Sequence, residues 1–454
     1  MNFGRYSNLK DSGSEQIGDI PAHWSVKRLK FLISEPLKYG ANEAAELTDP
    51  DLPRYVRITD VKDDGTLREE TFRSLPLEVA KDYLLSDGDI LFARSGATVG
   101  KSFIYRLEWG EAAYAGYLIR ARMNEEMNAD FAYLFLQSNC YWQWLNSIFI
   151  QATIQNVSAE KYGNLVLPVP PIEEQKKIIL FLRFKTAQID ALIAKKKALL
   201  EKLAEKRTAL ISHAVTKGLD PTVPMKDSGV QWLGEVPAHW EVPLLGYVAE
   251  VRGGVTKGRK LPDEQTVELP YLRVANVQDG YVDLSHVAAI EILASEIPRY
   301  SLQKGDVLMN EGGDNDKLGR GAVWAGEIEP CLHQNHVFAV RPRIPELSSW
   351  LALLTQSSYA KFYFYSTAKQ STNLASISSS NIKRLPVLLP PVEERRAIID
   401  HVNRSLSAID KQREKVVSII ERLQEYRCSL ITNAVTGKID VRATSLSNVD
   451  RAVG

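Results

Sequence analysis

The most regular pattern in the chain is a hydrophobic position that recurs every seven residues along two long segments. In the second segment the spacing is unbroken, and its positions are Val402, Ile409, Val416, Leu423 and Leu430. The first segment has the same spacing, with Lys196 as its only polar position, and its hydrophobic members are Leu182, Ile189, Leu203 and Leu210. A strict seven-residue repeat is typical of a helix that packs along a partner helix, because a surface helix of period 3.6 drifts off it. Each segment is therefore predicted to be one helix of a coiled coil.

The ends of both helices can also be predicted from the sequence. Each segment begins after a Pro-Pro pair, Pro170–Pro171 or Pro390–Pro391, and proline is tolerated at the start of a helix but not in its interior. Two glutamates follow each pair, where carboxylates favour the positive end of the helix dipole. No Pro or Gly then occurs until Gly218 and Gly437, so each helix has about 45 residues and spans about 65–70 Å.

The two helices belong to an internal repeat that covers most of the chain. Matching segments recur in the same order about 216 to 220 positions later: Lys10–Gly13 as Lys226–Gly229, Pro21–Trp24 as Pro237–Trp240, Gly88–Leu91 as Gly305–Leu308, Pro170–Glu174 as Pro390–Glu394, and Ala214–Thr216 as Ala434–Thr436. This period is far too long for a solenoid repeat. Each copy is therefore predicted to be a globular domain followed by a helix.

Short apolar runs between Gly and Pro fill the globular part of each copy, which predicts a mixed α/β fold. The runs predicted to be strands include Tyr55–Val61, Asp89–Ala93, Ser102–Tyr105 and Val337–Val340, and Phe131–Tyr141 is predicted to be helical. The predicted boundaries are 1–168 for the first globular domain, 169–218 for the central helix, 219–388 for the second globular domain, 389–440 for the C-terminal helix and 441–454 for a disordered tail.

The simplest partner for each helix is the helix of the other copy, because the two hydrophobic stripes occupy equivalent positions. If the copies are related by a pseudo-two-fold axis, the helices run antiparallel and the chain forms a dumbbell of two globular domains. The alternative is that each helix packs only on its own domain, but the length of the heptad pattern argues against it.

Composition narrows the possible functions. With 44% hydrophobic and 25% charged residues, the 454-residue chain is typical of a soluble globular protein. Its 56 basic and 56 acidic side chains argue against a simple polycationic DNA binder but permit local basic surfaces. No membrane span is expected, and Met1–Lys10 lacks a signal-peptide core. The three cysteines, Cys140, Cys331 and Cys428, are widely spaced and fit no disulfide framework. A reducing cytoplasm is therefore the expected compartment.

This layout resembles the specificity (S) subunit of type I restriction-modification enzymes. The resemblance covers nearly the whole chain and rests on Ile17–Trp24 with Leu233–Trp240, on the Gly-Asp-(Ile/Val)-Leu segments, on the Pro-Pro-x-Glu-Glu helix entries and on the Ala-Val-Thr helix ends. It implies that each globular domain is a target-recognition domain that reads one half of a split, asymmetric DNA site. A fixed helix length then sets the half-sites roughly one helical turn apart, about 10 bp from centre to centre.

The resemblance also implies partners. The helices would dock two methyltransferase subunits, and restriction subunits would join them on double-stranded DNA. Adenine methylation and ATP-dependent restriction would be carried out by those subunits with S-adenosylmethionine, ATP and magnesium, and this chain would bind no cofactor and no membrane.

Three motifs superficially resemble catalytic or metal sites. Gly96–Ser102 is like a phosphate loop, but Ser95 stands where the first glycine belongs and the residues after the motif are predicted to form a strand. A nuclease-like pair of acidic residues at Asp51 and Asp60 is lost in the second copy, which has Asn276 in the second position. A suspected metal group has too few ligands and no counterpart in the first copy: Cys331, His333 and His336.

No methyltransferase signature is present, because both Pro-Pro pairs open helices instead of forming a base-holding loop. His23 and His239 stand in equal contexts beside Trp24 and Trp240 and are interpreted as structural. No catalytic residue and no metal ligand is therefore assigned to this chain.

Candidate DNA contacts fall at matching places of the two copies. Base edges in the major groove are read by Arg or Lys at guanine and by Asn or Gln at adenine, and small residues allow close approach. The candidates in the first copy are Arg57, Thr59, Arg94, Ser95, Thr98, Lys101, Gln151, Thr153, Gln155 and Asn156. Those in the second copy are Arg273, Asn276, Asn310, Asn315, Lys317, Arg320, Gln370, Thr372 and Asn373. Since Arg57 and Arg273 occur in both copies, they are expected to hold phosphate or scaffold, and the unshared residues are expected to specify bases.

Other functions remain open at this point. The same module could serve a related two-subunit enzyme that cuts on both sides of its site, which neighbouring genes would distinguish. An autonomous DNA-modifying enzyme would show methyl transfer or cleavage by the purified chain. A coiled-coil scaffold without a DNA role would show no DNA affinity even with methyltransferase partners present.

Overall fold

The chain forms two compact units. The computed structural model describes residues 4–62, 65–150, 156–260, 266–313, 317–370 and 375–442. The first unit combines Met1–Lys196 with Ser418–Gly454, and the second unit is Lys197–Val417. The division falls within both long helices, so each unit holds one globular part and one half of each helix.

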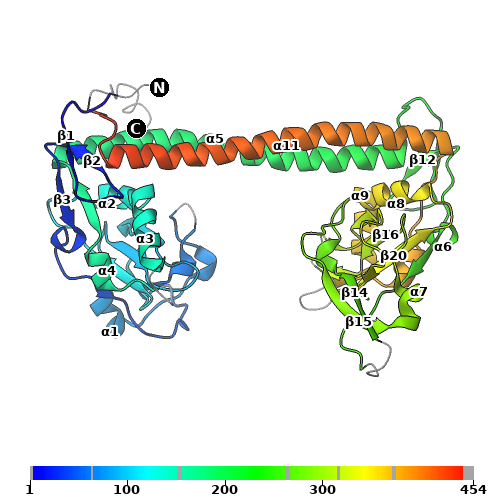
Figure 1. Ribbon diagram of the computed structural model, residues 1–454, viewed down its shortest axis with the longest axis horizontal. Coiled ribbons are helices and arrows are strands. Elements are labelled where there is room, and N and C mark those ends of the chain that lie inside the picture. Colours follow the sequence, from blue (N-terminus) through cyan, green and yellow to red (C-terminus); the bar gives the residue numbers. More distant parts are fainter. Residues whose placement is uncertain are drawn as a thin grey trace. The chain divides into compact units, whose positions relative to one another are not determined.

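The two heptad segments form single long helices, α5 (Ile172–Lys217) and α11 (Val392–Val435) (Figure 1). A glycine with positive φ closely follows each of them, Gly218 at 76° and Gly437 at 71°. This left-handed conformation costs glycine little and commonly ends a helix.

Within the first unit, the first half of α5 packs on the last half of α11. Leu182 and Ile189 of α5 share one hydrophobic core with Leu430 of α11. At the edge of this contact, Nε of Arg427 donates to Oδ1 of Asp190 at 2.9 Å.

Within the second unit, the last half of α5 packs on the first half of α11. Ile211 and Val402 share its core, and Arg207 pairs with Asp410 at 3.4 Å. Because the start of one helix meets the end of the other in each unit, the helices run antiparallel. The predicted antiparallel pairing is confirmed, and the alternative in which each helix packs only on its own domain is wrong.

The heptad positions line this contact. Of the nine, Leu210 and Leu423 are partly buried and pack against the two cores, and the remaining seven are buried: Leu182, Ile189, Leu203, Val402, Ile409, Val416 and Leu430. Thr186 and Ile193 are buried between them, so that the contact positions of α5 alternate in steps of four and three. That alternation is the knobs-into-holes spacing of a coiled coil.

The globular part of the first unit is built on a four-stranded antiparallel sheet in the order β4 (Lys38–Tyr39), β9 (Leu118–Ala121), β6 (Ile90–Ala93) and β7 (Ser102–Ile104). Two-stranded pairs join β1 (Leu9–Asp11) to β2 (Asp19–Pro21), β3 (Ser25–Arg28) to β10 (Val166–Val169), and β5 (Arg54–Val56) to β8 (Ala112–Tyr114). The helices are α1 (Leu77–Ala80), α2 (Ala129–Phe135), α3 (Asn139–Ile150) and α4 (Ala159–Gly163).

The second unit is built on a sheet in the order β13 (Ala249–Arg252), β20 (Val337–Pro342), β16 (Val307–Asn310) and β18 (Gly321–Val323). A two-stranded sheet joins β11 (Met225–Asp227) to β12 (Glu235–Pro237). One three-stranded sheet has the order β15 (Ala288–Leu293), β14 (Thr266–Leu272) and β19 (Leu332–His333). Another has the order β17 (Gly312–Gly313), β22 (Ala375–Ser376) and β21 (Lys369–Gln370). The helices are α6 (Leu245–Val248), α7 (Ile297–Tyr300), α8 (Leu347–Thr355), α9 (Ser358–Thr367) and α10 (Ser379–Lys383).

The main sheets of the two globular parts share one topology. Both four-stranded sheets are antiparallel throughout, and the register matches, with Leu91 opposite Arg120 in the first unit and Leu308 opposite Ala339 in the second. The prediction of two copies of one mixed α/β fold is therefore confirmed.

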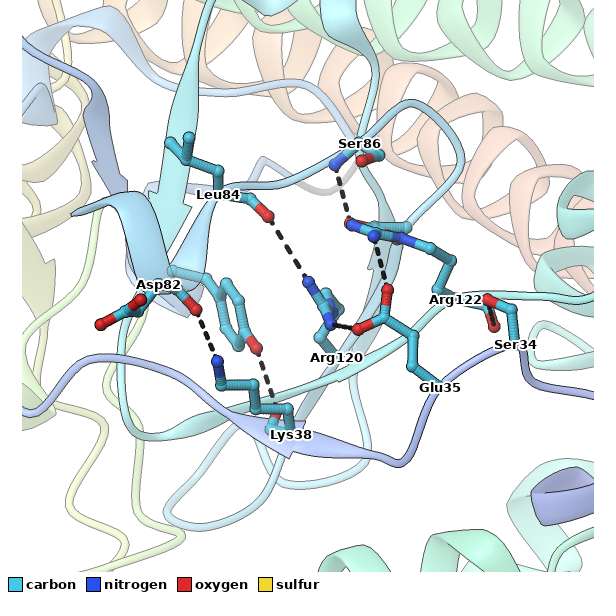
Figure 2. A network of polar contacts seen from close by, with 10 residues as sticks. Ser34, Glu35, Lys38, Asp82, Leu84, Ser86, Arg120 and Arg122 are labelled. Atoms are coloured by element: carbon cyan, nitrogen blue, oxygen red, sulfur yellow. Dashed lines mark hydrogen bonds and ion pairs between the residues drawn. The ribbon is translucent and has the colours of Figure 1, made fainter.

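The repeated Gly-Asp segment is part of the scaffold. Asp89 is buried, accepts the N–H of Ser86 at 2.8 Å and pairs with two guanidinium nitrogens of Arg122 at 2.8 and 2.7 Å. Figure 2 shows the surroundings of this pair, where Arg122 and Arg120 both contact Glu35. In the second unit, Asp306 accepts the N–H of Gln303 at 2.8 Å and pairs with Arg341 at 2.7 Å. Each aspartate thus closes the turn before the central strand.

The repeated His-Trp pairs lie against the first turns of the long helices. His23 Nε2 is 2.8 Å from the Glu174 carboxylate, and His239 Nε2 is 2.6 Å from that of Glu394. The indole N–H of the fully buried Trp240 donates to Glu394 at 3.1 Å. These contacts support the structural interpretation of both histidines.

The predicted strand Tyr55–Val61 is wrong in its second half. Strand β5 ends at Val56, and a 3₁₀ turn follows at Ile58–Asp60. The Asp60 carboxylate accepts the N–H of Arg57 at 2.8 Å, and a short polar side chain that bonds the local backbone in this way ends regular structure.

The predicted helical segment Phe131–Tyr141 is interrupted. Helix α2 ends at Phe135 and α3 begins at Asn139. Between them the Ser138 hydroxyl donates to the Phe135 carbonyl at 2.6 Å and so competes with the helical hydrogen bonds.

The sequence predicts a disordered segment from 441 onward, but the first residue of that segment is packed. Val441 is buried in the core of the first unit, and Arg442 pairs with Asp440 at 2.7 Å. This pairing raises the pKa of Arg442 above its usual value. Hydrophobic burial therefore places Val441 in the core of the first unit, past the predicted boundary at 440.

Within the described ranges, no helix combines the length and the apolar character needed to cross a membrane. The same ranges contain no group of three or more His, Cys, Asp or Glu residues suited to a metal ion. Two residues of the suspected metal motif are core residues instead, and burial raises the pKa of Cys331 to about 12 and lowers that of His333 to about 4. The third, His336, lies at the surface with Nδ1 2.6 Å from the Glu311 carboxylate.

Candidate nucleic-acid interface

Two of the polar segments predicted to face DNA come together in the first unit, beyond the end of β6. Ser95 and Asn156 form an antiparallel bridge, and the N–H of Val157 donates to the Arg94 carbonyl at 2.9 Å. The N–H of Arg94 in turn donates to the Tyr117 carbonyl at 3.1 Å. The backbone thus places the Gly-rich segment beside a segment far away in the sequence.

The Gly-rich segment is a tight turn with an exposed tip. Gly96, at φ 77°, is exposed and has open space where a Cβ would lie, whereas a Cβ on Gly100 would meet Leu145 at 2.0 Å. Lys101 is exposed and Thr98 is half-buried. Strand β7 follows, as predicted, so the segment lacks the helix that a nucleotide-binding phosphate loop requires.

Aromatic side chains flank the first of these segments. The Arg94 guanidinium lies over the ring of Tyr39, 4.9 Å from its centre, and the Tyr39 hydroxyl accepts the N–H of Ala159 at 3.1 Å. Tyr117, whose carbonyl holds the Arg94 N–H, is 68% exposed. A guanidinium and a tyrosine at one exposed place can both donate hydrogen bonds to the phosphates of duplex DNA.

The second unit joins its corresponding segments in the same way. The N–H of Glu311 donates to the His336 carbonyl at 2.9 Å, and the N–H of Ile377 donates to the Glu311 carbonyl at 2.8 Å. Just beyond, Gly312 of β17 lies opposite Ser376 of β22. The loop after β16 therefore lies beside the segment that follows α9.

A third candidate segment of the second unit adjoins these two. The Arg320 guanidinium donates to the Gln278 side chain at 3.3 Å, and the Asn310 amide donates to the Val277 carbonyl at 3.1 Å. Three sequence clusters that were predicted separately thus meet in one place.

Two of the predicted DNA contacts, Asn310 and Asn276, are instead part of the scaffold. Asn310 is 1% exposed and lies beneath this surface. Asn276 is also buried; its oxygen accepts the N–H of Arg273 at 2.8 Å, and its amide donates to the carbonyls of Asp283 and His286. A buried amide that is already hydrogen-bonded in this way cannot reach a base edge.

The remaining candidates stay predictions. Thr59 is exposed, Lys317 is half-buried, and Gln370 ends strand β21. Six others lie outside the described residues: Gln151, Thr153, Gln155, Asn315, Thr372 and Asn373.

One part of the interface was missed by sequence reasoning. In the first unit, Ala41 pairs in parallel with Ala115, and the N–H of Ala115 donates to the Val56 carbonyl at 3.0 Å. The segments that contain Ala41, Ala115 and Val56 therefore run side by side, with the segment of Ala115 in the middle, and they end at one edge. We call the residues that follow them the first rim: Asn42–Glu43, Gly116–Tyr117 and Arg57.

The second unit has the same feature. Val255 pairs in parallel with Gln334, and the N–H of Gln334 donates to the Leu272 carbonyl at 2.9 Å. The residues that follow these three segments form the second rim: Thr256–Lys257, Asn335–His336 and Arg273.

Two glycines could have revealed the rims. A Cβ on Gly40 would lie 2.2 Å from the Tyr114 carbonyl oxygen, and one on Gly254 would lie 2.1 Å from that of His333. Only glycine allows this close approach of the rim segments. The two glycines are at equivalent places of the repeat, which is the sequence signal that was overlooked.

Comparison with known proteins decides the family. The family model described as "Type I restriction modification DNA specificity domain" matches residues 42–202 and 237–418, so it covers both rims and most of the chain. The chain belongs to this family. The two matched ranges are its specificity domains, and the resemblance noted in the sequence is confirmed.

Individual relatives agree with this assignment. The specificity subunit of the type I restriction enzyme EcoKI from Escherichia coli K12 is 24% identical over 437 residues, which cover 93% of this chain and 90% of the relative. The StySPI specificity subunit from Salmonella potsdam is 23% identical over 435 residues, with the same coverage. A chain in a solved structure on the assembly and conformational transition of the type I R-M system has the same fold, with a TM-score of 0.64 at 17% identity, covering 92% of this chain and 99% of that one.

The segments described above lie within or beside these specificity domains. The function of this family member is DNA sequence recognition in a type I restriction-modification system. The comparisons show no catalytic family.

Proposed function

We propose that each specificity domain reads one half of a bipartite, asymmetric DNA site and that the chain itself carries out no catalysis. The observation that carries this proposal is that the two units share one fold and one arrangement of loops but present different side chains there. For example, Arg94 in the first unit lies at the place that Glu311 takes in the second. Two domains of the same fold that present different side chains at equivalent places suit a DNA target made of two unlike halves.

In this proposal, the paired helices α5 and α11 set the spacing of the half-sites and dock two methyltransferase subunits. A coiled coil of fixed length suits a fixed spacing, which we expect to be about 10 bp from centre to centre. The cytoplasmic complex then methylates adenine and restricts DNA through its methyltransferase and restriction subunits. Those subunits, and not this chain, hold S-adenosylmethionine, ATP and magnesium.

Exchange of one globular part tests the proposal. Residues 1–168 are replaced by the corresponding part of the EcoKI relative, the helices are kept, and methylated adenines are mapped across the genome of cells that carry the partner subunits. Only one half of the methylated sequence should change, at unchanged spacing. The reciprocal exchange of residues 219–388 should change only the other half. A change in both halves, or methylation at the original sequence after either exchange, would contradict the proposal.

A further inference from the structure

We propose that the second specificity domain grips the DNA backbone through two cations of its rim, Lys257 and Arg273, and that the first domain has no equivalent grip. This inference rests on the proposed function, because it assigns a role within the same DNA interface. It follows from a comparison of equivalent positions in the two rims.

The geometry brings Lys257 and Arg273 to the same edge. Val255 donates its N–H to the His333 carbonyl at 2.8 Å, and its carbonyl accepts the N–H of Asn335 at 3.0 Å. On the other side of the segment that contains His333 and Asn335, Leu272 pairs with His333. Lys257 follows Val255 by two residues, and Arg273 follows Leu272 directly. Both side chains belong to exposed residues. Parallel segments that end together therefore present both cations on one edge.

The two rim arginines differ because of one residue three positions further on. In the first unit, the Arg57 guanidinium donates twice to the buried Asp60 carboxylate, at 3.1 and 2.8 Å, and once to the Thr71 carbonyl at 2.8 Å. Arg57 is thereby neutralised and held as scaffold, which is one of the two roles expected for it.

In the second unit, the neutral Asn276 occupies the position of Asp60 and uses its oxygen for the Arg273 N–H. The turn is preserved, but the carboxylate is gone. Within the described part of the chain, the Arg273 guanidinium makes no ion pair. The replacement of one buried acid by an amide thus leaves a positive charge available at the second rim.

The other rim position shows the same difference in charge. Ala41 and Val255 are equivalent in the repeat, so Lys257 corresponds to Glu43, and both are exposed. A carboxylate repels a phosphate where an ammonium group attracts it. Gly258 follows Lys257 at φ 79° with open space where a Cβ would lie, and the missing side chain lets the loop approach a backbone closely.

Two acids near this rim have partners of their own. The Glu296 carboxylate is paired twice with Arg259 at 2.8 Å, and the Glu311 carboxylate is hydrogen-bonded to Nδ1 of His336 at 2.6 Å. Arg259 is therefore not counted among the gripping cations.

The expected signature is an unequal dependence of DNA affinity on salt. Each phosphate contact contributes about 0.9 to the slope of log affinity against log salt, which is about a 3.5-fold loss between about 50 and about 200 mM salt. Loss of both Lys257 and Arg273 should reduce the slope by about 1.8, which is about a 12-fold smaller loss over this range.

The experiment uses the full chain and a fluorescein-labelled mixed-sequence duplex of about 40 bp, long enough for a non-specific contact, with affinity measured by fluorescence anisotropy across this salt range. The test variant is K257Q/R273Q. The matched control is K304Q, which removes one positive charge from an exposed position at the other end of β16. The reciprocal variant is E43K in the first rim.

The double variant should show the reduced slope, K304Q should match the wild type, and E43K should steepen the slope by about 0.9. A wild-type slope in the double variant, or an equal reduction in K304Q, would overturn the assignment of the grip while DNA binding itself stands. An unchanged slope in E43K would overturn the equivalence of the two rims. A wild-type chain whose DNA binding does not depend on salt would overturn the proposed function as well.

Discussion

Acidification is expected to destabilise the second unit through one buried histidine. His333 is 2% exposed, and its Nδ1–H donates to the Val337 carbonyl at 2.6 Å. Burial lowers the pKa of His333 from 6.5 to about 4, although this hydrogen bond and the Asp306 carboxylate oppose the shift. The charged ring is disfavoured because it would lie in a low-dielectric core.

The sign follows from comparing the two states. Since the folded pKa is lower than the unfolded one, the unfolded chain binds the proton first as the pH falls. The stability that the neutral His333 ring provides is fully present above pH 6.5 and is lost as the pH falls from 6.5 towards 4. At ~1.36 kcal/mol per pH unit, the full loss is about 3 kcal/mol, and most of it, about 2.5 kcal/mol, is reached near pH 4.5.

The variant His333→Asn isolates this effect, because an amide nitrogen can donate to the Val337 carbonyl without titrating in this range. Urea unfolding of the full chain is followed by tryptophan fluorescence, to which the buried Trp324 of the same unit contributes. Between neutral pH and about pH 4.5, the wild type should lose about 2–3 kcal/mol more than the variant. The control His286→Asn changes an exposed histidine and should behave as the wild type does. Equal losses in the wild type and His333→Asn would refute the reasoning.

Two further predictions concern packing, and both are measured by urea unfolding at neutral pH. Leu182→Ala removes a fully buried side chain between the long helices and should cost about 2–5 kcal/mol, whereas Leu180→Ala, on the exposed face of the same helix, should change stability by less than about 0.5 kcal/mol. Gly319→Ala should cost about 2–4 kcal/mol, because a Cβ at φ 65° would lie 2.1 Å from the Phe364 ring; Gly258→Ala, which has open space at φ 79°, should cost only about 1 kcal/mol. A loss in the Leu180 variant as large as in the Leu182 variant, or equal losses in the two glycine variants, would contradict these packing arguments.

The long helices could be predicted almost completely because their determinants are local. Proline sets the start, glycine sets the end, and the heptad of which Ile189 and Val416 are members depends only on spacing along one segment. The internal repeat then indicated that each helix packs against the helix of the other copy. The interruption at Ser138 was missed because its hydroxyl competes with the backbone, and hydrophobic periodicity does not register that competition.

The candidate interface was predictable in part. Residue type and position in the repeat directed attention to the loops after β6 and β16, whose role in DNA contact stays a prediction, but neither measures burial. Asn276 and Asn310 have the right chemistry for reading adenine and are nevertheless used inside the fold. The difference between Arg57 and Arg273 depends on whether an acid stands three residues later and turns back towards the arginine. Such a contact belongs to the folded loop and not to a sequence pattern.

The division of the two long helices between the units has a consequence for the order in which the protein is made. The second unit consists of one uninterrupted stretch, 197–417, and can close its core as soon as that stretch has left the ribosome. The first unit starts before that stretch, but its core includes Leu430, Ile431 and Val435, which are made after it. Although domains usually fold in the order of their synthesis, here the first recognition module must wait, with an uncovered apolar face, until the residues that follow the second unit have been made. A premature stop near residue 418 would therefore spare the second reader and leave the first one incomplete.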